Sequence, residues 1–188
     1  EAQAAKRAEQ ARSEKEFVEK RDRVVPLDIE IVISRSQADK KISALPYALT
    51  VNAPSPFNSL SSTPLTQLRM GGQIPLPTTA PALGPDGKPV AGFTGGGPVQ
   101  YKEIGTFIDA RGRWLDTQPA TFEVWISVQE DAVATPQGAS PQALPVIRTF
   151  RAANNLVLRV GQTRQFTAAA DRITGEVVKV DVTLKVAK

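Results

Sequence analysis

Strict alternation of apolar and polar residues near the C-terminus is the feature that most constrains the fold. Between residues 176 and 186, every second side chain is valine or leucine, and lysine, aspartate and threonine fill most of the places between. The apolar set is Val178, Val180, Val182, Leu184 and Val186. A period of two separates the two faces of a strand, and one buried face opposite one wet face is typical of an antiparallel sheet.

The same period recurs along the chain. Residues 122–128 place Phe122, Val124, Ile126 and Val128 on one face, with Glu123, Trp125 and Ser127 on the other. Further strands are predicted at 67–76, 146–151, 156–160 and 163–170, with turns at 111–112, 117–119, Gly161 and Gly175. Eight or nine strands without intervening helices predict an all-β fold, an antiparallel β-sandwich over residues 24–188.

A hairpin is predicted at the start of this domain. Residues 27–34 alternate, with Leu27, Ile29, Ile31 and Ile33 on one face. Residues 36–40 form a rather long turn, and 42–51 form the return strand, with Tyr47, Leu49 and Val51 on one face. Pro46 interrupts the return strand, which predicts either a bulge or an edge position there.

Residues 99–166 show a recognisable succession of strands and turns. A strand ends in Ile-Gly at 104–105, a long alternating strand covers 122–130, a strand begins after Pro145, and another closes with Gly-Gln-Thr at 161–163. The succession resembles the β-domain of bacterial secretins, the outer-membrane secretion pores. It also resembles uncharacterised secreted bacterial β-proteins that share the Gly-Gln-Thr ending. Because the matching residues are turn and core residues, the resemblance implies a related or convergent sandwich module and carries over no functional residue.

Residues 1–23 are predicted to form a helical arm. They contain no glycine or proline and are rich in alanine, glutamate, lysine and arginine. Such a helix is roughly 33 Å long, and its thin apolar stripe leaves it marginal alone in water. It is either a solvated tail or a helix that packs on a neighbouring subunit. The expected assembly contacts are Ala4, Ala8, Ala11, Phe17 and Val18.

Residues 53–98 form a long segment rich in proline and glycine. Prolines stand at 54, 56, 64, 75, 77, 81, 85, 89 and 98, and the charged residues are Arg69, Asp86 and Lys88. This density blocks continuous regular structure, apart from a strand around Gly71-Gly72, a pair that suits a bulge. The segment is either a surface loop or an extended stretch laid over the sheet or over a neighbouring subunit.

Composition removes several kinds of catalytic site. The chain has no histidine and no cysteine, which excludes thiolate and imidazole metal sites and Ser-His or Cys-His pairs. The candidate carboxylates are expected on solvent faces or turns: Asp109, Glu123, Glu130, Asp131 and Asp171. Trp114, Trp125 and Tyr101 form either a sugar-binding patch or, as we expect, sheet-face packing. We therefore predict no enzyme activity, no catalytic residue, no cofactor and no metal.

The net charge and the hydropathy of the chain limit the kinds of partner that it is expected to bind. The net charge of +4 is small and dispersed, which argues against nucleic acid, and no apolar run is long enough for a membrane-spanning helix. With the secretin resemblance, these features favour a secreted, extracellular or periplasmic location with a signal peptide removed. The predicted function is a non-enzymatic structural protein that assembles with itself into a filament or other homo-oligomer. The alternative is a monomeric periplasmic accessory or binding module attached to envelope proteins.

Overall fold

The described part of the chain is built almost wholly from strands. The computed structural model describes residues 12–15, 23–38, 40–55, 59–77, 99–115, 121–134, 146–172 and 174–187. The strands are β1 (Val24–Gln37), β2 (Lys40–Pro54), β3 (Thr66–Pro77), β4 (Val99–Trp114), β5 (Thr121–Ala134), β6 (Val146–Arg159), β7 (Thr163–Ala170) and β8 (Glu176–Val186). A short 3₁₀ turn, η1 (Leu60–Ser62), precedes β3. The predicted all-β fold of two antiparallel sheets is confirmed.

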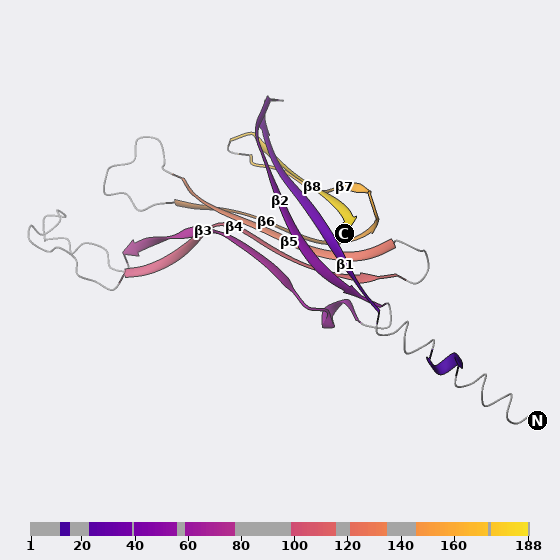
Figure 1. The fold of residues 1–188 in the computed structure, drawn as a ribbon. Helices are drawn as coiled ribbons and strands as arrows, with labels where there is room; N and C mark the ends of the chain where they lie inside the picture. The colour runs from indigo at the N-terminus through magenta and orange to yellow at the C-terminus, as the bar shows by residue number, and fades with distance from the viewer. Residues whose placement is uncertain are drawn as a thin grey trace, which may run out of the picture. The chain divides into compact units, whose positions relative to one another are not determined.

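The first sheet has the strand order β2-β1-β8-β7 (Figure 1). Its apolar positions are in register across three strands, because Ile31 pairs with Tyr47 of β2 and with Val182 of β8. The predicted alternation of β8 is confirmed, since its valines at 178, 180 and 182 and its leucine are buried. This aligned apolar face is the main source of the core, since its buried side chains leave water together.

The β1–β2 hairpin is tighter than the sequence predicted. Gln37 pairs with Lys40, so only two residues join the strands, and Ala38 takes a positive φ of 46°. The register of the hairpin shifts between Arg35 and Ser36, and pairing is regular at Pro46. The bulge interpretation of Pro46 is therefore wrong. The edge interpretation is confirmed, because an outer strand leaves one side of its backbone without a ladder.

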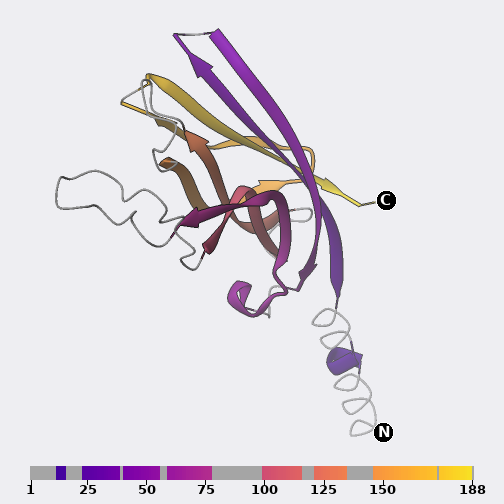
Figure 2. The same cartoon turned by 90° about the vertical axis from the view of Figure 1, so that its left-hand side faces the viewer.

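The second sheet has the order β3-β4-β5-β6 (Figure 2). The predicted turn at 111–112 is wrong, because β4 continues to Trp114. Gly112 is buried instead, and a Cβ there would lie 3.5 Å from Val51 and 3.6 Å from Leu27, in ordinary contact with the first sheet. The turn expected at 117–119 lies outside the described residues.

Strand β6 also differs from the prediction. Two short strands separated by residues 152–155 were predicted, but β6 is continuous from Val146 to Arg159. The Ala-Ala-Asn-Asn stretch has low strand propensity, and pairing with a long neighbour overrides it. The turns predicted at Gly161 and Gly175 are confirmed, with φ values of 80° and 68°.

The chain divides into two compact units. Unit 1 comprises residues 1–68, 108–127 and 152–188, and unit 2 comprises 69–107 and 128–151. All four strands of the first sheet belong to unit 1, whereas the described part of unit 2 consists of segments of β3 to β6. Among the described residues of unit 2, Val128 is the one hydrophobic side chain in the buried core. The described part of unit 2 is therefore a four-stranded sheet segment with few buried hydrophobic residues.

The two expected appendages are described only in part. Residues 12–15 are helical and exposed, and the other residues of the predicted arm before Arg23 lie outside the described residues. Of the segment 53–98, residues 56–58 and 78–98 also lie outside them. The strand predicted at 67–76 is confirmed as β3.

Candidate functional site

The predicted assembly contacts fall outside the part of the chain that the structure describes. They are Ala4, Ala8, Ala11, Phe17 and Val18. The arm ends beside a described contact, since the Arg23 guanidinium lies 5.2 Å from the centre of the Trp114 ring. This cation–π contact places Arg23, the last residue of the predicted arm, against Trp114 of β4.

Two of the five candidate carboxylates are not on the surface as predicted. Glu130 is 9% exposed and Asp131 is 5% exposed. The sequence contained the signal for Glu130, because it continues the inward alternation of Phe122 to Val128. Neighbours on a strand point to opposite faces, so Glu130 and Asp131 do not form a carboxylate pair.

The other carboxylates serve structural contacts. Glu123 forms an ion pair of 2.6 Å with Arg113, and Asp109 accepts a hydrogen bond from Gln67. The main-chain carbonyl of Asp171 accepts a hydrogen bond from Gly175 in the β7–β8 turn. These residues connect neighbouring strands and a turn, and their contacts do not bring them together in one site.

The aromatic residues do not form an open sugar platform. Arg23 lies over Trp114, and Arg111 lies 4.7 Å from the centre of the Trp125 ring. Both indoles are thus covered by guanidinium groups, which agrees with the predicted sheet-face packing. Tyr101 is 64% exposed and belongs to unit 2, whereas both tryptophans belong to unit 1.

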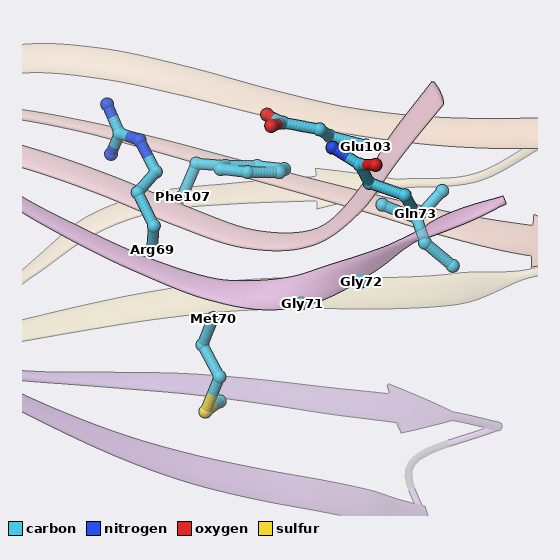
Figure 3. A pocket seen from close by; sticks show the side chains of 8 residues that line it. Arg69, Met70, Gly71, Gly72, Gln73, Glu103 and Phe107 are labelled. Atoms are coloured by element: carbon cyan, nitrogen blue, oxygen red, sulfur yellow. The ribbon is translucent and has the colours of Figure 1, made fainter. Parts of the chain in front are cut away.

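An open hollow of about 430 Å³ lies on unit 2, where β3 meets β4 (Figure 3). Arg69 covers the Phe107 ring at 5.7 Å, and Met70 points to the opposite side of β3. Gly71 and Gly105 let the backbones of β3 and β4 approach each other closely. A Cβ on Gly71 would overlap the Ile104 carbonyl oxygen, and Gly105 has a φ of 134°. Gly71 permits a close approach of two backbones, a common reason for glycine inside a strand, and the bulge at Gly71-Gly72 stays a prediction.

The chemistry available in this hollow is limited to binding. Its described lining contains no serine, threonine, cysteine, histidine or tyrosine. Arg69 and Glu103 are exposed residues of opposite charge in this lining. Such a surface suits polar or charged contacts with another chain, and it offers neither a nucleophile nor a proton-transfer pair.

A second hollow, of about 690 Å³, lies on the β1–β2–β8 side of unit 1. Lys185 donates a hydrogen bond of 2.8 Å to Glu30, and Thr50 donates one of 2.7 Å to Asp28. The hydrogen bond to Glu30, and then its charge, raise the pKa of Lys185 above its ordinary value of 10.5. These contacts form a cross-strand polar ladder on a solvent face.

The Gly-Gln-Thr turn is structural, as the sequence resemblance implied. Gly161 supplies the positive φ, and the Gln162 side chain accepts a hydrogen bond of 3.0 Å from the Arg159 main chain. The Thr163 hydroxyl lies 2.7 Å from that of Thr183 on β8. Each residue of the motif therefore fixes the β6–β7 connection.

No family model and no curated protein matches this chain. Its fold is similar to secretin domains in solved structures. InvG of the Salmonella SPI-1 injectisome is 12% identical with a TM-score of 0.49, covering 96% of this chain and 68% of InvG. The type II secretin GspD of enteropathogenic Escherichia coli is 9% identical with a TM-score of 0.49, covering 96% of this chain and 74% of GspD. Aeromonas hydrophila ExeD is 8% identical with a TM-score of 0.46, covering 87% of this chain and 48% of ExeD.

The resemblance to secretins predicted from residues 99–166 thus reappears in the comparison of structures. At these identities the likeness concerns the fold alone. Within the described ranges, no helix is both long and apolar enough to cross a membrane. The same residues include no cluster of three or more acidic, histidine or cysteine side chains that could hold a metal ion.

Proposed function

We propose that this chain is a non-enzymatic structural protein of the bacterial envelope or exterior that assembles with copies of itself. The contacts would be the arm of residues 1–23, the extended segment 53–98 and the sheet edges. The observation that carries the proposal is the nature of unit 2. Its described part is a four-stranded sheet segment in which Val128 is the one buried core hydrophobic residue. A sheet with so little buried area gains stability by being covered or extended by another chain.

The edges of this sheet segment support a selective form of pairing. Strands β3 and β6 are the outer strands, and each presents a row of main-chain groups without a ladder on one side. Pro75 on β3 has no main-chain N–H to donate, and Arg151 on β6 adds a charged side chain to that edge strand. Such residues disfavour random edge pairing, so a specific partner is required.

The arm supports the proposal independently. A polar helix of this length is marginal alone, and its alanines permit close approach to a neighbour. The core of the sandwich does not need it, because the inward residues of β1, β5 and β8 already fill unit 1. An ordered arm would therefore be held by another subunit.

Light scattering coupled to size exclusion tests the role of the arm. We expect the full chain to form particles well above its 20.2 kDa mass and residues 24–188 to be a folded monomer. Replacing Ala8 and Ala11 together with glutamate should weaken assembly and shift the melting temperature of the domain by only a few degrees. Replacing Ala2 and Ala5 with glutamate is the matched control, because these positions lie outside the stripe. Normal assembly of the shortened chain would show that the arm is a tail.

A second function is favoured by the edges of the first sheet. Pro46 lies on the edge strand β2, and the edge strand β7 carries a register shift between Gln165 and Thr167. Blunted edges of this kind keep a sandwich monomeric. They favour a monomeric periplasmic accessory module bound to envelope proteins. A full chain that scatters as a 20.2 kDa particle at every concentration would select this alternative.

A further inference from the structure

We propose that the β6–β7 turn is a binding site for a phosphate group. The site is an open hollow of about 660 Å³ in unit 1. Arg159 and Arg164 line it from the two sides of the turn, and Thr121 at the start of β5 lines it as well. The proposal is independent of self-assembly, since all of these residues belong to one compact unit.

The turn holds its two arginines in a defined spacing. The Arg159 main chain donates to the Gln162 side chain at 3.0 Å, and Gln162 donates back to the Arg159 carbonyl at 3.0 Å. Gly161 donates to the Leu184 carbonyl at 2.7 Å, which ties the turn to β8. Arg164 follows immediately on β7 and pairs with Val182. The backbone positions of both arginines are therefore set before any ligand arrives, which lowers the ordering cost of binding.

Thr121 supplies the independent observation. This residue is only 6% exposed, and its hydroxyl has no hydrogen-bond partner among the described residues. A buried hydroxyl without a partner is unusual, because native structures pair nearly all such groups. A ligand oxygen in the hollow, reached after rotation of the threonine side chain, would accept its hydrogen bond.

The surrounding charge selects an anion. The charged residues of its described lining are two arginines, Arg159 and Arg164. None of the described residues that line the hollow is acidic. Guanidinium groups match the tetrahedral oxygens of phosphate with paired, charge-assisted hydrogen bonds. The shared chemistry is a phosphate oxyanion, which either a soluble phosphorylated molecule or a phospholipid headgroup supplies.

The first test uses inorganic phosphate on the full chain. The melting temperature is measured against phosphate concentration, with chloride at equal ionic strength as reference, and an apparent Kd is taken from the increase. We expect Arg164→Gln, Arg159→Gln and Thr121→Val each to raise this Kd about two- to fivefold, as for loss of one exposed charged or polar contact. Arg172→Gln is the matched control, because it removes the same charge outside the hollow, and its Kd should equal that of the unaltered chain.

Phosphate also stabilises proteins generally by exclusion from their surface, and that effect is the same for every variant. Equal increases in all four variants and the unaltered chain would overturn the proposal.

The second test distinguishes the sources of the phosphate. The full chain and Arg164→Gln are sedimented with phosphatidylcholine vesicles, with and without phosphatidylglycerol. Binding that needs phosphatidylglycerol and falls in Arg164→Gln supports a lipid headgroup. Phosphate binding that depends on Arg164, without vesicle binding, supports a soluble phosphorylated ligand. Absence of both overturns the proposal.

Discussion

At the scale of single residues, three glycines of β3 and β4 have different roles despite their proximity. Gly71 and Gly105 bring two backbones together, and a Cβ on Gly71 would lie 2.9 Å from the Gly105 Cα. Gly72 is adjacent in sequence, yet a Cβ there would meet nothing within 4 Å. The Gly71-Gly72 pair therefore contains one residue that the fold requires and one that it does not.

Alanine substitution should separate these roles. Gly105→Ala combines a strained φ with overlap of the Met70 backbone, so we expect the free energy of unfolding to fall by about 2–4 kcal/mol. Gly72→Ala, the matched control, should change it by less than about 0.5 kcal/mol. Urea denaturation followed by circular dichroism measures both. Equal effects of the two substitutions would contradict the close approach of β3 and β4.

At the scale of elements, the sequence predicted strands better than it predicted their ends. The alternations of β1, β5 and β8 were confirmed because inward residues of one strand meet inward residues of the next. The turn at 111–112 and the break at 152–155 were wrong for the same physical reason. Local glycine and asparagine signals were overridden by pairing with a long neighbouring strand.

The candidate site was less predictable than the strands. Burial of Glu130 was available from its place in the β5 alternation. The hollow proposed to bind phosphate could not be predicted, because Thr121 and Arg164 are far apart in the sequence and line one hollow only in the folded chain. The Gly-Gln-Thr motif predicted the turn but did not predict which side chains lie around it.

Strand β1 is one of the two inner strands of the first sheet, and truncation of its buried side chains should be costly. Ile31 is fully buried between Tyr47 and Val182. We expect Ile31→Ala to lower the free energy of unfolding by about 2–5 kcal/mol, the usual cost of an aliphatic cavity. Val157→Ala on the exposed side of β6 is the control and should cost less than about 0.5 kcal/mol. A cost below about 1 kcal/mol for Ile31→Ala would place the core elsewhere.

At the scale of the whole molecule, the two units differ in what stabilises them. Unit 1 contains the first sheet, segments of the second and nearly all the buried hydrophobic residues described, whereas the described part of unit 2 contains only segments of the second sheet. Strands β4 and β5 pass through both units, so one strand samples two environments.

Hydrogen exchange should reveal this difference within a single strand. For the unassembled chain of residues 24–188, we expect amides at 124–127 of β5 to exchange only through global unfolding. Amides at 129–133 of the same strand should exchange at least about tenfold faster, because fewer apolar contacts hold them. Mass spectrometry of peptic fragments measures both segments. Uniform protection along β5 would show that unit 2 is stabilised as strongly as unit 1.

The placement of the two tryptophans under arginine side chains has a practical consequence for optical measurements. Trp114 and Trp125 both belong to unit 1, and the chain has no other tryptophan. Tryptophan fluorescence will therefore report the unfolding of unit 1 and will not report the unfolding of unit 2, which contains Tyr101. An unfolding curve recorded by tryptophan fluorescence alone would be a single clean transition even where the chain melts in two steps. Tyrosine absorbance must be recorded as well to detect a separate melting step of unit 2, which contains Tyr101.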